Sequence, residues 1–164
     1  MTTVNWMKGD LIKLTKEGRF DAVAHGCNCF HTMGSGIAPK LNNLTGGRLL
    51  REDIDKTYYG DINKMGTVSY VTQNINGKRV EFFNLYTQYT YGSRPNGEVY
   101  IHWDSLYNSI MLMMDLTLGQ DIGIPLIGCG LAGGEREDFE MVMDRLKNGP
   151  YQYDINLHVI EFSS

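Results

Sequence analysis

Two stretches of the chain place glycines and small side chains at a spacing suited to holding an anion. Residues 24–41 read AHGCNCFHTMGSGIAPKL, and residues 122–135 read IGIPLIGCGLAGGE. Each stretch passes from a short apolar segment through a glycine-rich turn toward a helix. Backbone N–H groups at such turns, together with the positive end of a helix dipole, bind anions. The pair predicts a ligand with two phosphates, or one phosphate held from both sides.

Three polar side chains, at Asp10, Asn28 and His31, have chemistry that could serve the rest of such a ligand. Asp10 can accept a hydrogen bond from an exocyclic amine, and Asn28 offers both a donor and an acceptor to ribose hydroxyls. His31 could orient or activate a water molecule. Each also has a structural interpretation: an aspartate in a turn, an asparagine capping its own loop, and a loop histidine exposed to solvent.

The alternation of His25, Cys27, Cys29 and His31 raises the question of zinc. Side chains at i and i+2 of a straight strand lie about 7 Å apart, too far for one tetrahedral ion. We therefore predict no metal and no cofactor, and interpret the thiols as small buried apolar groups. Cys129 as a nucleophile would need an activating positive charge, which the sequence does not supply.

The segments that must position these residues alternate between strands and helices. Strands are predicted over 3–8, 20–25, 66–73, 79–86, 122–127 and 155–162, and helices over 37–41, 49–59, 100–118 and 135–146. Asn76-Gly77 predicts a hairpin, and Asp104 is a helix N-cap candidate. The alternation predicts a three-layer α/β/α fold with a mixed sheet and a single domain over residues 1–164. Both glycine turns fall at the carboxyl ends of strands, where such sheets bind ligands.

Composition narrows the classes of partner. The chain has 164 residues, a net charge of −4 and three cysteines, an odd number that fits a reducing cytoplasm better than a disulfide framework. Lys and Arg are scattered, so general nucleic-acid binding is not expected. No apolar run approaches a membrane span and the N-terminus lacks a signal-peptide pattern, so we expect a cytoplasmic protein without a membrane partner.

Four motifs together resemble the macro domain, the ADP-ribose-binding family. Gly9-Asp10-Leu11 resembles its Gly-Asp-Ile/Leu, and His25-Gly26-Cys27-Asn28 stands where the family often has Asn-Ala-Ala-Asn. Residues 34–38, GSGIA, resemble its Gly-Gly-Gly-Val/Ile-Ala, and 125–133 resemble its second loop. The resemblance implies the macro-domain fold and a small-molecule ligand, ADP-ribose or ADP-ribose-1″-phosphate. It implies ligand contacts at Asp10, Leu11, Asn28, Gly34, Ser35, Gly36, Ile37, Gly128, Cys129, Gly130, Leu131, Ala132 and Gly133.

Within that family the motifs look most like the branch holding ADP-ribose-1″-phosphate phosphatases and hydrolases of ADP-ribosyl adducts. The predicted activity is hydrolysis of ADP-ribose-1″-phosphate to ADP-ribose and phosphate, with His31 and Asn28 as the candidate catalytic residues. Gln88 and Ala132 stand where the adduct hydrolases carry a Lys and an Asp, and neither can do that chemistry. The alternatives are a non-catalytic ADP-ribose-binding module, and a hydrolase acting on ADP-ribosylated protein or nucleic acid.

Overall fold

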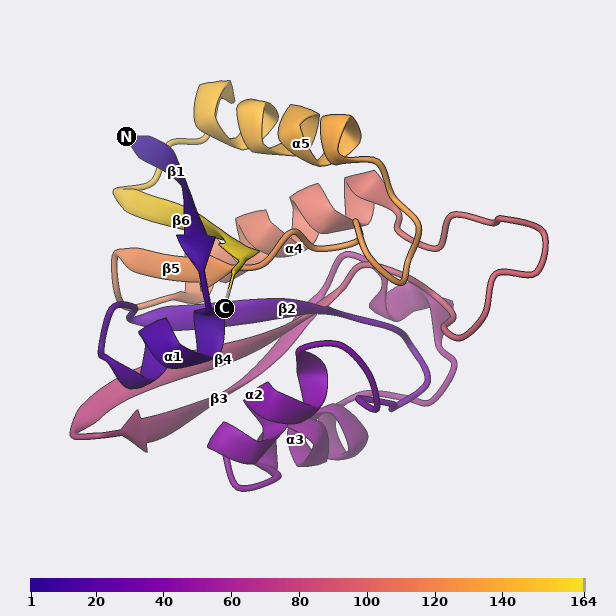
Figure 1. Ribbon diagram of the computed structural model, residues 1–164, viewed down its shortest axis with the longest axis horizontal. Coiled ribbons are helices and arrows are strands. Elements are labelled where there is room, and N and C mark those ends of the chain that lie inside the picture. Colours follow the sequence, from indigo (N-terminus) through magenta and orange to yellow (C-terminus); the bar gives the residue numbers. More distant parts are fainter. Residues whose placement is uncertain (164) are drawn as a thin grey trace.

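The computed structural model describes residues 1–163, which build one six-stranded sheet with helices on both faces (Figure 1). In chain order the elements are β1 (Thr2–Gly9), α1 (Leu11–Lys16), β2 (Ala22–Cys27), α2 (Ala38–Leu44), α3 (Arg48–Lys56), the 3-10 turn η1 (Ile62–Lys64), β3 (Val68–Ile75), β4 (Lys78–Tyr86), α4 (Trp103–Leu116), β5 (Asp121–Ile124), α5 (Arg136–Asn148) and β6 (Ile155–Phe162).

The sheet is mixed. Its strand order is β1-β6-β5-β2-β4-β3, and only β3 runs antiparallel to its neighbour. The β3–β4 hairpin closes through Asn76 and Gly77, both with positive φ, as a two-residue hairpin turn requires. The predicted three-layer α/β/α architecture with a mixed central sheet is therefore confirmed. The carboxyl ends of β2, β4 and β5 lie side by side because these strands are parallel neighbours.

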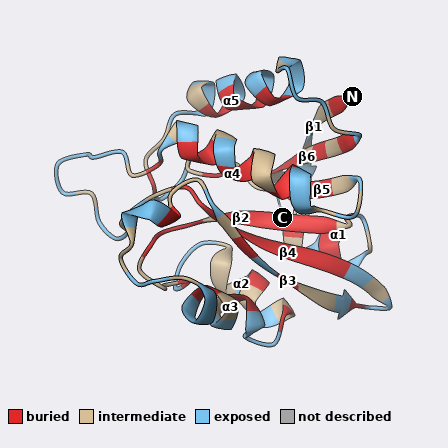
Figure 2. Ribbon diagram, turned by 180° about the vertical axis from the view of Figure 1, so that it is seen from behind, coloured by how far each residue is buried: buried red, intermediate tan, exposed pale blue. Residues whose placement is uncertain are grey.

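Two apolar layers hold the helices to the sheet (Figure 2). Helices α4 and α5 cover one face, and Phe139 and Leu106 lie fully buried between them and the strands. Helices α1, α2 and α3 cover the other face over Phe82 and Val80. The strands between these layers are apolar on both faces, as parallel strands covered on both sides must be.

Several element boundaries differ from the sequence prediction for local reasons. β5 ends at Ile124 rather than residue 127, because Pro125 has no N–H to continue the ladder. Helix α4 begins at Trp103, and its N-cap is His102, whose side chain accepts from the Ser105 amide. The assignment of the cap to Asp104 was wrong: Asp104 lies inside the first turn, where it pairs with Arg145 at 3.3 Å.

The segment after β1 forms the short helix α1, which is not among the helices predicted from the sequence. Asp10 caps it by accepting hydrogen bonds from the amides of Ile12 (2.9 Å) and Lys13 (3.3 Å). Within residues 1–163, no helix has the length and apolarity needed to cross a membrane.

Candidate ligand-binding cleft

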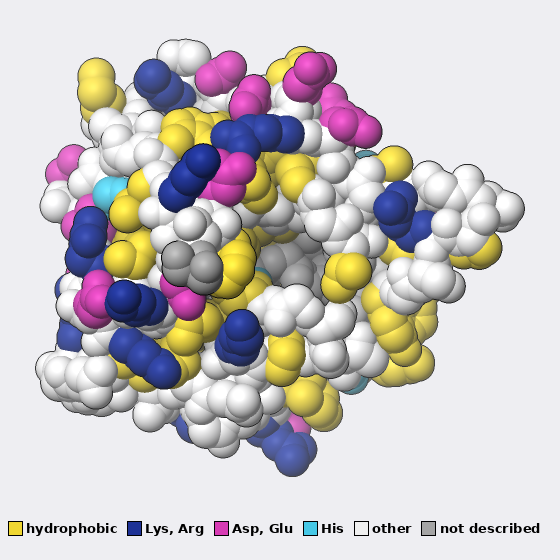
Figure 3. Space-filling view, viewed as in Figure 1, with side chains coloured by type: hydrophobic (Ala, Val, Ile, Leu, Met, Phe, Trp, Pro, Cys, Tyr) yellow, Lys and Arg dark blue, Asp and Glu magenta, His cyan; other side chains and the backbone are white. Residues whose placement is uncertain are grey.

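Both glycine-rich turns line the same cleft at the carboxyl ends of β2, β4 and β5. The cleft has a volume of about 900 Å³ and opens on the face shown in Figure 3. From the first turn it is lined by Asn28, Gly34, Ser35, Gly36 and Ile37, and from the second by Gly128, Gly130, Leu131 and Ala132. Residues about a hundred positions apart in the chain thus face one space.

A smaller cavity of about 350 Å³ adjoins this cleft, because Gly36, Ile37 and Pro125 line both. Asp10 and Leu11 lie in its wall, together with Phe162, Ile160 and Lys40. The two cavities are therefore neighbours, with Phe162 in the wall of the smaller one and the glycine turns in the wall of the larger one. Phe162 is 71% exposed, so it does not belong to the core.

Most backbone N–H groups on the two turns are unpaired. Among residues 1–163, the amides of Gly34, Ser35, Gly36 and Ile37 donate to no protein acceptor. The same holds, within this part of the chain, for the second-turn amides, which are those of Gly128, Gly130, Leu131 and Ala132. Backbone donors at the surface of a cleft, without partners of their own, are available to an anion.

Cys129 and Gly133, both predicted to contact the ligand, do not line the cleft. Their amides donate to carbonyls inside the turn: the Cys129 amide to the Leu126 carbonyl at 3.2 Å, and the Gly133 amide to the Gly130 carbonyl at 3.0 Å. Gly133 instead gives the turn a positive φ of 78°. Burial raises the pKa of the Cys129 thiol to about 11, so the thiol is protonated at neutral pH and a weak nucleophile.

Asn28 lines the cleft, yet its side chain also shapes its own loop. Its Nδ2 donates to the hydroxyl of Thr32 at 2.7 Å, and its Oδ1 accepts from the Phe30 amide at 2.8 Å. The interpretation of Asn28 as a loop cap, which the sequence left open, is therefore present here. The bond to Thr32 occupies an Nδ2 hydrogen of Asn28 that would otherwise be available to a ribose hydroxyl.

The structure does not bring His31 into the cleft. Its Nε2 lies 3.1 Å from the Thr57 hydroxyl and 3.9 Å from the carboxylate of Asp53, and its ring packs edge-on against Tyr59. His31 has a positive φ of 55°, and this backbone conformation turns the chain between Asn28 and Gly34. The prediction of His31 as a catalytic residue requires its ring in the cleft, whereas the structure turns the ring toward Thr57 and Asp53.

His25 is the histidine that lines the cleft; the sequence raised it as a possible zinc ligand and as the first residue of the motif resembling Asn-Ala-Ala-Asn, but not as a catalytic residue. Its Nε2 lies 2.7 Å from the Asn84 Oδ1. Since the amide nitrogen of Asn84 donates to Ser69 and to Leu49, its oxygen must accept, and His25 donates through Nε2. Burial lowers the pKa of His25, so the ring is neutral with Nδ1 unprotonated.

Behind His25 a buried polar network continues to an ion pair. Ser69 bonds the Tyr86 hydroxyl at 2.7 Å, and Tyr86 donates to Asp53 at 2.7 Å. Asp53 also accepts from Lys64 at 3.2 Å. Because a buried charge without a partner is costly, this network fixes the end of β2 and the segment 53–64 relative to each other.

Gly26 shows why the floor of the cleft needs glycine. A Cβ at this position would lie 2.6 Å from Ile127 and 2.8 Å from the Thr87 hydroxyl. β2 therefore approaches the second turn more closely than any side chain allows.

Gln88 and Ala132 both line the cleft, and Gln88 donates to the Thr90 carbonyl at 2.8 Å.

Comparison with known proteins agrees with this fold. The macrodomain of Mycobacterium tuberculosis DarG superposes with a TM-score of 0.68 at 13% identity, covering 98% of each chain. The structure of Thermosipho africanus DarTG in complex with ADP-ribose superposes with a TM-score of 0.69 at 13% identity, covering 97% of this chain and 41% of that one. The protein therefore has the macro-domain fold.

A sequence relative gives a closer placement. The uncharacterised 17.5 kDa protein of the tk–vs intergenic region of Enterobacteria phage T4 is 34% identical over 145 residues, which are 86% of this chain and 88% of that protein. The chain belongs to the same family as this phage T4 protein. No sequence-family model matches the chain.

Proposed function

We propose that this protein binds ADP-ribose, with the diphosphate between the two glycine turns. The observation that carries the proposal is the set of unpaired amides on two turns whose residues line one cleft. Backbone donors can neutralise a diphosphate without cationic side chains, which suits a chain of net charge −4. Thermosipho africanus DarTG and the Trypanosoma brucei macrodomain, two solved structures that share this fold, are complexes with ADP-ribose, and this supports the choice of ligand.

The smaller cavity supports an adenine next to the cleft. Asp10 uses Oδ1 to cap α1, while its second carboxylate oxygen has no hydrogen-bond partner within residues 1–163. An exocyclic amine could donate to that oxygen, with the exposed ring of Phe162 beside the base. The distal ribose would then lie toward Asn28.

Calorimetric titration tests the binding proposal. ADP-ribose should bind with a measurable heat, and AMP, which lacks the diphosphate, at least about tenfold more weakly, since charge-assisted hydrogen bonds contribute about 1.5–3 kcal/mol each. Absence of binding at millimolar ADP-ribose would contradict the proposal. Equal affinity for AMP would contradict the role of the two turns.

A second proposal is hydrolysis of ADP-ribose-1″-phosphate. It is favoured by the number of unpaired amides, since a terminal phosphate needs donors beyond those that hold the diphosphate. His25 rather than His31 is the candidate base, because His25 is among the residues that line the cleft, whereas the His31 ring faces Thr57. Release of inorganic phosphate from ADP-ribose-1″-phosphate tests this activity. No release at high enzyme concentration would leave binding alone as the function.

A further inference from the structure

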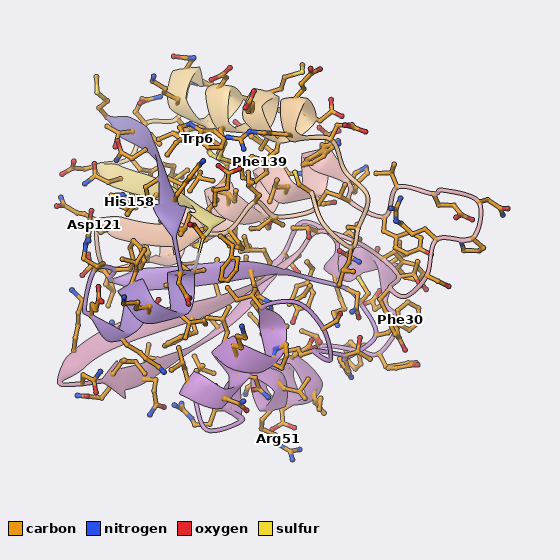
Figure 4. All side chains as sticks on the ribbon, in the orientation of Figure 1. Trp6, Phe30, Arg51, Asp121, Phe139 and His158 are labelled. Atoms are coloured by element: carbon orange, nitrogen blue, oxygen red, sulfur yellow. The ribbon has the colours of Figure 1, made fainter. Side chains whose placement is uncertain are left out.

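An ordered aromatic patch lies at the cleft end remote from Asp10. It consists of Phe30, Tyr59, Tyr89 and Tyr91, and Phe30 is at its centre, with ring centroids 4.9 Å from Tyr89, 5.2 Å from Tyr59 and 6.4 Å from Tyr91. Tyr59 is 69% exposed and Tyr91 is 49% exposed. Figure 4 places Phe30 at the edge of the molecule beside the projecting loop, and Figure 3 shows hydrophobic side chains gathered along that edge.

Backbone bonds between three distant segments hold the patch together. The Cys29 amide donates to the Tyr89 carbonyl at 3.0 Å, and the Gly60 amide donates to the Cys29 carbonyl at 2.7 Å. The Tyr89 hydroxyl donates to the Gly60 carbonyl at 2.9 Å. These bonds fix the backbone of the segments that carry Phe30 and Tyr89 and the ring of Tyr89, which lowers the entropy lost when a ligand stacks on the patch.

The patch is continuous with the cleft through one residue. Tyr91 lines the cleft and also belongs to the patch. Asn28 also lines the cleft, and its Oδ1 accepts from the Phe30 amide. A group attached to the ligand beyond Asn28 would therefore leave the cleft over aromatic rings.

Charge decides which group suits the patch. The contributing segments 28–33, 57–62 and 89–93 contain one carboxylate, Asp61, and no Lys or Arg. A nucleic-acid strand needs cationic side chains along its phosphates, which these segments lack. A flat ring that carries positive charge is attracted both by the faces of Tyr and Phe and by a nearby carboxylate.

We propose that the protein binds dinucleotides whose distal ribose still carries a planar, positively charged nitrogen heterocycle, and that the aromatic patch receives this ring. The inference rests on the proposed function, because the diphosphate must occupy the cleft for the ring to reach Tyr91. It widens the ligand class from ADP-ribose to intact pyridinium dinucleotides, for which NAD⁺ is the probe.

The test is calorimetric titration of the full chain with ADP-ribose, NAD⁺ and NADH. NAD⁺ and NADH differ in the charge and aromaticity of the nicotinamide ring. The ratio of their affinities therefore reports the contribution of the aromatic patch. NAD⁺ should bind about threefold or more tightly than NADH, the scale of a partly exposed cation–π contact. Tyr91→Leu should abolish this preference, whereas Tyr91→Phe should keep it. Tyr151→Leu, at an exposed tyrosine in the loop before β6, is the matched control and should also keep it.

The outcomes separate the two proposals. If ADP-ribose itself does not bind, the proposed function fails. If ADP-ribose binds but NAD⁺ does not, or Tyr91→Leu leaves the NAD⁺ to NADH ratio unchanged, the inference about the patch is overturned while ADP-ribose binding stands. A single-stranded oligonucleotide whose binding is lost in Tyr91→Leu, or a dimer lost in Tyr59→Leu, would assign the patch to a different occupant and also overturn it.

Discussion

The Nε2 atom of His31 lies 3.1 Å from the hydroxyl of Thr57, so the ring faces the segment after α3 and not the cleft beside its own loop. We expect His31→Ala to leave the affinity for ADP-ribose, and any release of phosphate from ADP-ribose-1″-phosphate, within about twofold. The free energy of unfolding should fall by about 1 kcal/mol, the usual contribution of one hydrogen bond. Urea unfolding, titration with ADP-ribose and the phosphate-release assay together check this. A large loss of phosphate release with unchanged stability would instead show that His31 takes part in the hydrolysis.

Asn28 should act on binding through the shape of its loop. Asn28→Ala removes the bonds to Thr32 and to the Phe30 amide, so we expect the affinity for ADP-ribose to fall about tenfold or more. Asn28→Asp keeps an acceptor for the Phe30 amide but loses the donor to Thr32, and it places a negative charge near the ligand. Comparison of both variants by titration is the measurement. Equal affinity in wild type and Asn28→Ala would show that neither the loop nor the ribose depends on this side chain.

Two glycines of the second turn separate binding from folding. A Cβ on Gly130 would have no protein atom within 4 Å. The free energy of unfolding of Gly130→Ala should therefore be within about 0.5 kcal/mol of that of the wild type. Its methyl would project at the cleft, and we expect weaker ADP-ribose binding by about tenfold.

Gly128 has a φ of +84°, and a Cβ there would lie 2.5 Å from Ile101. Gly128→Ala should therefore lose about 2 kcal/mol or more of stability. Thermal unfolding with parallel titration distinguishes the two, and a stable Gly128→Ala would contradict the described turn.

Asp10→Asn tests recognition of the base. Asparagine caps helices as well as aspartate does, so α1 should keep its stability within about 0.5 kcal/mol. Loss of the charged acceptor should weaken ADP-ribose binding about tenfold, the scale of one hydrogen bond to a charged group. The discrimination between ADP-ribose and its hypoxanthine analogue, in which an oxygen replaces the exocyclic amine, should shrink at the same time. Unchanged discrimination would place the base elsewhere.

Stability should depend on pH through His25. Burial lowers the pKa of His25 below its ordinary value of 6.5, so the unfolded chain takes up a proton at a pH where the folded protein does not. The free energy of unfolding should fall as the pH drops below 6.5 toward the folded pKa, with a slope of at most about 1.4 kcal/mol per pH unit for one proton. Asp21, whose pKa is also lowered, loses its contribution only below its ordinary value of 3.8.

Urea unfolding at about pH 7 and about pH 5 measures this slope. His25→Gln, which keeps an amide N–H for Asn84, should be less stable but show a flatter dependence. His102→Asn serves as the control, because asparagine also caps helices and the change removes an exposed histidine. The same slope in wild type and His25→Gln would mean that another group titrates.

The strands, the longer helices and the positions of both glycine turns followed from the sequence because they depend on local pattern. Apolar runs of β-branched residues, Asn76-Gly77 at a hairpin, and glycines after apolar segments each specify the backbone over a few residues. Asp10, Asn28 and most of the turn residues were assigned to a ligand site through their resemblance to macro-domain motifs, and the structure brings them to the walls of the cleft and of the smaller cavity beside it. Pro125 also ends β5 by a local rule, although the predicted strand ran on to residue 127.

Tertiary structure alone decided which way the polar side chains face and what they touch. His31 and His25 differ in role because one positive φ turns the first toward Thr57, while the register of β2 against β4 places the second beside Asn84. The polar network to Asp53 and the aromatic patch join residues from three or more segments that no local spacing relates. Contacts of that kind depend on how the chain packs in three dimensions, and a one-dimensional pattern holds no record of them.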